Sequence, residues 1–270
     1  MPELPEVETV KNTLKKIILN KKIKCATIYW NNIIAFPKPE EFKEKIKNQK
    51  INDILRRGKW LMFELDDYFL LSHLRMEGKY FIRNKNDERT KHEHVLITFT
   101  DNTELRYHDT RKFGKMYLIK KEDVYKTKPL NELGLEPWDK TLTPKYLKEK
   151  LNKNPIKTQL LDQNIITGIG NIYADEILFQ SKINPLKEGN KLTNKNLDDI
   201  INYTKLTLEK AIKKGGTTIK SYTSAEGVHG LFQNELLVHT KDFCPACNSK
   251  IEKIKVGGRG TYYCPKCQKR

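Results

Sequence analysis

The chain has 270 residues, and its 51 lysines and arginines against 34 aspartates and glutamates give a formal net charge of +17. This excess favours a polyanionic partner such as nucleic acid, although a coding bias toward lysine, asparagine and isoleucine is an alternative source of the charge. The sequence has no apolar stretch near the roughly 18 residues of a spanning helix, and its acidic start is unlike a secretory signal peptide. We therefore expect a soluble intracellular protein, with two domains or one large one.

The first segment, MPELPEVETV, starts an amphipathic pattern at the chain end. The spacing of its apolar residues predicts a helix over residues 5–19. Pro5 suits the first turn of that helix, and Glu6 and Glu8 suit the positive end of its dipole. The apolar positions of the predicted helix are Val7, Val10, Leu14, Ile17 and Ile18.

After this helix the pattern becomes that of short strands. Residues 59–74 predict two strands around Asp66–Asp67, and residues 94–109 predict two more around Asp101–Asn102. We expect a mostly antiparallel β domain that carries the N-terminal helix. A charged, proline-containing linker is expected at 121–140.

The helical period returns at residue 143. Thr143 is expected to cap a helix with Pro144 in its first turn. Residues 155–163 and 171–180 predict further short helices, and a longer helix ends at Gly215–Gly216. The apolar face of the longer helix consists of Leu197, Ile200, Ile201, Thr204, Leu208, Ala211 and Ile212.

Four cysteines cluster near the C-terminus as two C-x2-C pairs: Cys244, Cys247, Cys264 and Cys267. Two residues between thiolates let both sulfurs of a pair reach one tetrahedral ion, so the sequence predicts one closed, structural Zn²⁺ site. Disulfides are the weaker alternative, because the chain is expected to be intracellular. The alternating residues between the pairs, with Gly257–Gly258 as a turn, predict a β-hairpin. Cys25 stands alone and is expected to be buried as a small apolar residue.

Two places suit phosphate. Arg259 lies between glycines at the tip of the hairpin, where it is either a phosphate ligand or an ordinary exposed arginine. Gly168 and Gly170 precede a helix that starts near Asn171, and N–H groups at a helix start bind phosphate. Taken alone, this second motif is better explained as a common helix–helix turn.

Two loops after strands combine basic and large apolar side chains. His73 and Met76 flank Arg75 in one loop, and Arg111 and Phe113 occupy a comparable place in the other. An enzyme that extrudes a base has to fill the gap in the stack, and an arginine there can hydrogen-bond the orphaned partner base. Taken singly, Met76 and Phe113 are better explained as core residues and His73 as a structural histidine.

Together these segments resemble the formamidopyrimidine-DNA glycosylases, bacterial base-excision repair enzymes. The resemblance implies an α+β fold, with an N-terminal helix on an antiparallel β-sandwich, a helix–two-turns–helix domain and a zinc finger, and predicts domains at 1–125, 126–230 and 231–270. The matching motifs are PELPEVET at the start, RRGKW at 56–60, HLRMEGK at 73–79, HDTRKFG at 108–114, GIGNIYADE at 168–176, FQNELLVH at 232–239 and GGRGTYYCPKC at 257–267.

The resemblance also implies a chemistry. Removal of Met1 would expose the secondary amine of Pro2, which attacks C1′ of the damaged nucleotide while Glu3 protonates the ring oxygen. The resulting iminium would permit β- and then δ-elimination. The implied activity is excision of oxidised purines (8-oxoguanine and formamidopyrimidines) from double-stranded DNA, with an associated abasic-site lyase activity. A monomer in the bacterial cytoplasm, at the nucleoid and away from membranes, is expected.

Residue roles follow from the same resemblance. Met76, Arg111 and Phe113 would fill the space left by the extruded base, and the 216–227 loop would line the lesion pocket, although its sequence departs from a pattern frequent in the family. The implied catalytic residues are Pro2, Glu3, Lys59 and Arg259. The implied DNA contacts are His73, Met76, Arg111, Phe113, Lys157 and Asn171. The implied pocket residues are Glu6, Thr217 and Tyr222.

Two alternatives stay open. An endonuclease VIII-like relative would remove oxidised pyrimidines with the same nucleophile, but Leu4 stands where that branch usually has glycine, and the Met76–Arg111–Phe113 set is present. A non-catalytic DNA-binding zinc protein would need neither Pro2 nor Glu3.

Overall fold

The computed structural model describes residues 1–217 and 230–269. Its internal contacts divide the chain into two units, one containing residues 1–131 and the other residues 132–217 and 231–269. The division between Asn131 and Glu132 falls inside the predicted linker at 121–140. That segment is not extended, because it forms the short 3-10 helices η2 (Lys121–Asp123) and η3 (Leu130–Glu132). The predicted domain boundaries at 125 and 230 stay a prediction.

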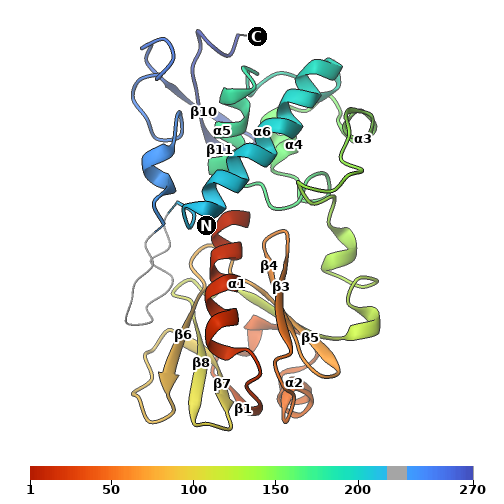
Figure 1. Cartoon of the computed structure of the whole chain (residues 1–270), viewed down its shortest axis with the longest axis vertical. Coiled ribbons are helices and arrows are strands. Elements are labelled where there is room, and N and C mark those ends of the chain that lie inside the picture. The colour runs from red at the N-terminus through yellow and green to blue at the C-terminus, as the bar shows by residue number, and fades with distance from the viewer. Residues whose placement is uncertain (218–229, 270) are drawn as a thin grey trace. The chain divides into compact units, whose positions relative to one another are not determined.

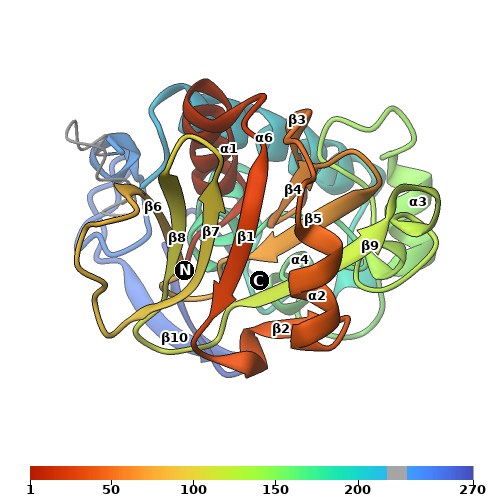
Figure 2. The ribbon, with the colours of Figure 1, turned by 90° about the horizontal axis from the view of Figure 1, so that it is seen from below.

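The first unit is built around two β-sheets with a shared core. One sheet has the strand order β1-β7-β8-β6, and the other has the order β2-β9-β5-β4-β3 (Figure 2). Neighbouring strands pair antiparallel except β2 and β9, which are parallel. The strands are β1 (Ile23–Ile28), β2 (Ile34–Phe36), β3 (Asp53–Arg57), β4 (Trp60–Glu64), β5 (Tyr68–His73), β6 (Lys79–Asn84), β7 (Glu93–Phe99), β8 (Thr103–His108) and β9 (Lys115–Lys120).

Helix α1 (Leu4–Ile18) confirms the predicted N-terminal helix to within one residue at each end. Its predicted apolar face is the face that packs into the core, against β3 and β4. Burial of this face fixes the orientation of the first turn, and therefore of the chain end that precedes it. The buried residues of that face are Leu4, Val7, Val10, Leu14 and Ile18.

Two features of the first unit differ from the expectation. Helix α2 (Pro39–Ile46) was not predicted, because its eight residues carry only two buried apolar side chains, Phe42 and Ile46, too few to show a helical period. Cys25 is exposed and not buried. The register of β1 shifts between Ile23 and Cys25, and this irregularity leaves both Lys24 and Cys25 on the outside of an edge strand.

The second unit is helical and ends in a β-hairpin (Figure 1). Helix α5 packs against α6, α4 and strand β11. Its elements are α3 (Pro144–Lys150), α4 (Ile156–Leu160), α5 (Asn171–Gln180), the 3-10 turn η4 (Gly189–Lys191), α6 (Asn194–Lys213), the 3-10 turn η5 (Phe232–Glu235), β10 (Glu252–Val256) and β11 (Arg259–Tyr263).

The predicted start of α3, the bounds of α5 and the end of α6 are confirmed, whereas the helix predicted over residues 155–163 is shorter and ends at Leu160. The Thr143 hydroxyl accepts a hydrogen bond from the Tyr146 N–H (3.3 Å) and so caps α3. At the end of α6, Gly215 and Gly216 have φ angles of 74° and 80°, and the Gly216 N–H closes on the Ala211 carbonyl at 2.9 Å. These left-handed angles suit glycine and end the helix. No helix among residues 1–217 and 230–269 is long and apolar enough to cross a membrane.

Candidate active site and nucleic-acid interface

The chain end is held at the first turn of α1. The Glu3 N–H donates to the Glu6 carboxylate (2.8 Å), and the Val7 N–H donates to the Glu3 carbonyl (3.1 Å). The side chains of Glu3 and Glu6 are 2% and 3% exposed, whereas Pro2 is only partly buried. The carboxyl group of Glu3, the residue next to Pro2 in the chain, and that of Glu6 are thus both sequestered at the first turn of α1. If Met1 is removed, Pro2 has a secondary amine, a possible nucleophile, one residue from a carboxyl group that can serve as an acid/base.

Lys59 lies in the turn between β3 and β4, and an arginine joins this turn to α1. The Arg56 Nε donates to the Glu8 carboxylate (2.7 Å), and its Nη1 donates to the Gly58 carbonyl (3.0 Å). Gly58 has a φ of 56°, which suits glycine. Burial raises the pKa of Glu8, but hydrogen bonds from Lys11 and Arg56 outweigh it and leave the pKa below its usual value. Glu8 is thus an anion at neutral pH and holds Arg56 in place.

His73 is the last residue of β5 and is a neutral group. Its ring packs edge-on against Trp60 at 4.8 Å between centroids, and its Nδ1 accepts the Arg75 N–H at 3.0 Å. Burial, with help from the charges of Arg75 and Lys59, lowers the pKa of His73 to about 3. Because Nδ1 is an acceptor, the neutral ring carries its proton on Nε2. His73 is therefore suited to donate one hydrogen bond, and not a charge, to a DNA phosphate.

The two loops predicted to enter the base stack are exposed in different degrees. Phe113 is 49% exposed, and Arg111 is also exposed, with its guanidinium carbon 4.7 Å from the centre of the Phe113 ring. Met76 is half-buried. Phe113 is consequently not a core residue, so the alternative explanation of this position as part of the core is wrong.

In the second unit, Asn171 is the first residue of α5, after Gly170. Its side-chain Nδ2 donates to the Gly260 carbonyl of the hairpin at 2.8 Å. This bond fixes the helix start against β11. The NH₂ group of Asn171 has a second N–H donor, so it can contact a phosphate and keep the Gly260 bond.

Lys157 was predicted to contact DNA, but its side chain does not reach the surface. Its side chain is fully buried, forms an ion pair with Asp175, and donates to the Asn171 carbonyl at 2.7 Å. A buried ammonium needs such partners, since desolvation without them is costly. The structure gives Lys157 the task of supporting the N-terminus of α5, while Asn171 stands next to it at that terminus.

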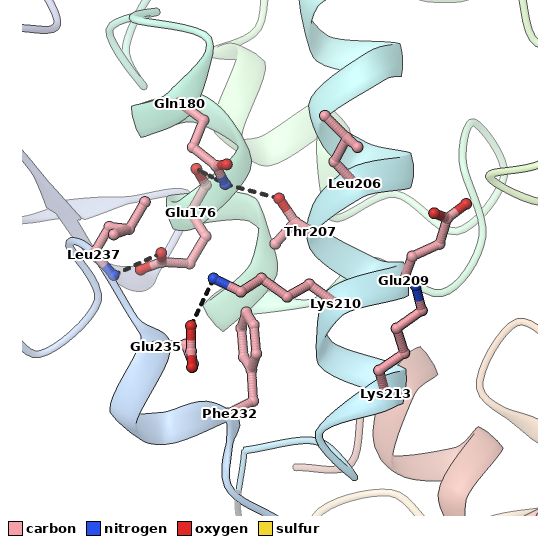
Figure 3. A pocket seen from close by; sticks show the side chains of 10 residues that line it. All are labelled: Glu176, Gln180, Leu206, Thr207, Glu209, Lys210, Lys213, Phe232, Glu235 and Leu237. Atoms are coloured by element: carbon pink, nitrogen blue, oxygen red, sulfur yellow. Dashed lines mark hydrogen bonds and ion pairs between the residues drawn. The ribbon is translucent and has the colours of Figure 1, made fainter.

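Two acids of α5 that had no predicted role fasten the following segments. Asp175 accepts hydrogen bonds from the His239 ring (2.6 Å) and the Tyr262 N–H (3.2 Å). The Glu176 carboxylate accepts the N–H groups of residues 237, 238 and 239 at 2.8–3.0 Å, and Figure 3 shows the bond from Leu237. Burial raises the pKa of Glu176, against the lowering by these bonds. These two roles could have been suspected from the sequence, because GIGNIYADE places two adjacent acids on a helix with few exposed positions.

The hollow drawn in Figure 3 is not part of the candidate site. It lies beside the segment that Glu176 holds and is lined also by Gln180, Thr207, Lys210, Phe232 and Glu235. None of the predicted catalytic or DNA-binding residues lines it.

The hairpin carries Arg259 and the four cysteines. Arg259 is exposed at the start of β11, after Gly257 and Gly258 with φ angles of 55° and 80°. The cysteine sulfurs all lie within 4.8 Å of one another, with separations of 3.5 Å and 3.8 Å between pairs. Thiolates around a tetrahedral Zn²⁺ lie about 3.8 Å apart for Zn–S bonds of about 2.3 Å. The four sulfurs thus fit one zinc ion, as predicted, and leave it no open position.

Three family models match the chain in succession. They are the formamidopyrimidine-DNA glycosylase N-terminal domain (residues 1–116), the H2TH domain of the same enzymes (133–223) and the zinc finger found in FPG and IleRS (241–270). The formamidopyrimidine-DNA glycosylase of Oceanobacillus iheyensis is 49% identical over 274 residues, covering 99% of this chain and 98% of the relative. The chain belongs to the formamidopyrimidine-DNA glycosylase family. The protein is therefore a DNA glycosylase that takes part in DNA repair.

Other members of the formamidopyrimidine-DNA glycosylase family are also similar to this chain along its full length. The enzyme of Bacillus subtilis is 46% identical over 273 residues, covering 99% of each chain. Among solved structures, wild-type Fpg of Lactococcus lactis in complex with DNA containing N7-benzyl-Fapy-dG has a TM-score of 0.93 at 40% identity, with full coverage of both chains. A complex of the same enzyme with DNA containing an abasic site matches with the same score. The predicted fold class is confirmed by this likeness.

The residues predicted to line a lesion pocket are only partly among the described residues. Glu6 and Thr217 are both buried, at 3% and 4% exposure. Tyr222 and most of the 216–227 loop lie outside the described residues.

Proposed function

We propose that the chain excises oxidised purines, 8-oxoguanine and formamidopyrimidines, from double-stranded DNA and then cleaves the abasic site by β,δ-elimination. The observation that carries this proposal is the chain end: Pro2 is accessible and is followed directly by the sequestered carboxyl group of Glu3. Support comes from the relatives, which are named formamidopyrimidine-DNA glycosylases, and from the solved complex of a Lactococcus lactis Fpg mutant with DNA that contains Fapy-dG.

The chemistry is covalent catalysis by an amine. The Pro2 nitrogen attacks C1′ of the damaged nucleotide, and Glu3 protonates the deoxyribose ring oxygen so that the base departs. A secondary amine on C1′ gives a cationic iminium, which acidifies the C2′ hydrogens. Loss of a C2′ proton then expels the 3′ phosphate, and a second elimination expels the 5′ phosphate. An α-amine has a pKa of about 7.7–8.0, so part of Pro2 is neutral at physiological pH.

The remaining proposed roles follow the geometry of each unit. Lys59, held by the Arg56 bridge to α1, contacts the DNA backbone near the lesion. His73 donates to a phosphate from Nε2, while Asn171 and Arg259 contact phosphates from the second unit. Phosphate contacts position the duplex without reading its sequence, and the net charge of +17 attracts it. We propose that the enzyme acts as a monomer.

Borohydride trapping on an 8-oxoguanine·C duplex tests the proposal. A covalent adduct that forms with wild type and disappears in Pro2→Gly supports it. Tight binding with neither adduct nor strand cleavage would instead indicate a non-catalytic DNA-binding protein. Duplexes with 5-hydroxycytosine or thymine glycol separate the purine branch from the pyrimidine branch, because an endonuclease VIII-like enzyme would form more adduct with those.

A further inference from the structure

The loop between β8 and β9 is organised by one buried carboxylate. Asp109 is 0% exposed. Its Oδ1 accepts the N–H of Arg111 at 3.0 Å, and its Oδ2 accepts the N–H groups of Phe113 and Gly114 at 2.9 Å and 2.8 Å. A carboxylate that satisfies three backbone donors within five residues fixes the path of the loop, since each of these N–H groups would otherwise be left without an acceptor.

Asp109 is itself tied to the neighbouring part of the sheet. Its N–H donates to the His92 carbonyl at 3.0 Å, and its carbonyl oxygen lies 2.9 Å from Nε2 of His94 on β7. The anchor of the loop is therefore hydrogen-bonded on both sides of its backbone to residues 92 and 94, at the start of β7. The exposed side chains of Arg111 and Phe113 stand on backbone that is bonded to this anchor.

The loop between β5 and β6, which carries Met76, also approaches Asp109, through the side chain of Tyr107. A Cβ on Gly114 would lie 1.8 Å from the Tyr107 hydroxyl oxygen, and a Cβ on Gly78 would lie 2.3 Å from it. Both loops thus approach this hydroxyl so closely that only glycine fits. The hydroxyl in turn lies 3.5 Å from Asp109 Oδ2, and burial, with the Asp109 charge, raises the pKa of Tyr107 well above its usual value. It stays protonated and is a donor toward the carboxylate.

A second link joins the loops at their surface. The Thr110 hydroxyl donates to the Glu77 carboxylate. Met76, Arg111 and Phe113 consequently stand on two loops that are connected both at the surface and at the buried anchor.

We propose that Asp109 is the positioning residue that presents Arg111 and Phe113 to the opposite strand, and that it thereby sets the discrimination among bases opposite the lesion. This inference rests on the proposed function, in which these side chains fill the space of the extruded base. An exposed arginine and phenylalanine on an unanchored loop would lose conformational freedom on binding DNA. A preformed loop avoids that cost.

Asp109→Asn is the sharpest variant, because it preserves shape. An amide offers one acceptor oxygen, so its NH₂ must face either the Arg111 N–H or the N–H groups of Phe113 and Gly114. Asp101→Asn is the matched control, since Asp101 also accepts a backbone N–H in a turn of this sheet, from Thr103 at 3.0 Å. Excision from an 8-oxoguanine duplex is compared with borohydride trapping on a single-stranded abasic oligonucleotide, which needs Pro2 but has no opposite base.

We expect the Asp109→Asn substitution to lower the rate of excision from the duplex about tenfold or more, because small displacements of groups that position a substrate are costly. Its discrimination among opposite C, A, G and T should flatten, while single-strand trapping stays within about twofold of wild type, because that substrate does not use the loop. Asp101→Asn should match wild type in all three measurements. An Asp109→Asn protein with wild-type duplex excision, or with equal losses on both substrates, would overturn the inference.

A double-mutant cycle adds a test that does not depend on how much stability is lost. If Asp109 acts through Arg111 and Phe113, adding Asp109→Asn to the double variant Arg111→Ala/Phe113→Ala should lower the rate of duplex excision little further. Independent roles would instead give additive losses.

Thr110→Val, at an exposed position, should cause a smaller loss of duplex excision and of discrimination among opposite bases. Absence of any Pro2-dependent adduct in wild type would reject the proposed function and this inference with it. A normal wild-type adduct with additive losses rejects the inference alone.

Discussion

Lys157 and Asp175 form an ion pair in which both side chains are completely buried. Asp175 also binds the His239 ring and the Tyr262 N–H, and Lys157 also binds the Asn171 carbonyl. The pair therefore connects the start of α5 to the hairpin that carries Arg259. Its location explains how a lysine in a DNA-binding motif can matter for DNA binding without touching DNA.

Removing one partner of this pair should destabilise the fold. Lys157→Met leaves the Asp175 carboxylate buried, so the free energy of unfolding should fall by about 3–5 kcal/mol. Urea unfolding measures it, with the exposed Lys153→Met as a control that should change little. A direct phosphate contact by Lys157 would instead leave the unfolding free energy intact and reduce the salt dependence of DNA binding by about one counterion.

The Arg56 bridge should matter for catalysis through Lys59. Arg56→Met removes the bonds to Glu8 and to the Gly58 carbonyl, so the turn that carries Lys59 loses its tie to the helix that carries Pro2. We expect about a tenfold loss in the single-turnover excision rate, because small displacements of catalytic groups are costly. Arg83→Met on β6 is the control. Equal rates for the two variants would show that the bridge is dispensable.

His73 should make the stability of the protein acid-sensitive without making its activity depend on pH near neutrality. The folded-state pKa of about 3 lies below the ordinary value of 6.5, so the unfolded chain binds the proton first as pH falls. The stability associated with neutral His73 is complete above pH 6.5 and is lost as pH falls from there toward 3. His73→Gln should therefore lose less stability than wild type between pH 7 and pH 5, as measured by urea unfolding. An equal loss in both proteins would show that His73 titrates normally when folded.

The zinc site should depend on the clustered cysteines and not on Cys25. Purified protein should hold one Zn²⁺, and Cys267→Ser should lose it together with DNA binding, because a structural metal holds its module folded. Cys25→Ser removes an exposed thiol on β1 and should keep both. Metal analysis after dialysis measures the content. Active, folded protein with less than about half an equivalent would contradict a structural site.

The sequence predicted the elements with strong periodicity and the residues with a distinctive spacing. The helix of the first twenty residues, the hairpin strands of the sandwich and the cysteine pairs all have such patterns. Helix α2 does not, since only Phe42 and Ile46 contact the core. The irregular register of β1 that exposes Cys25 depends on pairing with β7, which no local pattern shows.

Residues whose role depends on burial were the hardest to predict. Lys157 has the charge of a DNA contact, and only its tertiary partners show that the charge is sequestered. Asp109 lies within the motif that carries Arg111 and Phe113, but its three backbone partners become visible only when the loop closes on it. Arg56 likewise acts through a helix that is 48 residues away in sequence.

The proposed mechanism depends above all on the nitrogen of Pro2 being the nucleophile. The most direct measurement is mass-spectrometric mapping of the borohydride-trapped adduct between the enzyme and an 8-oxoguanine duplex. We expect the deoxyribose fragment on the N-terminal peptide, at Pro2, and we expect protein that retains Met1 to bind the duplex but yield no adduct. An adduct on a lysine such as Lys59, or an adduct formed equally well with Met1 in place, would contradict it.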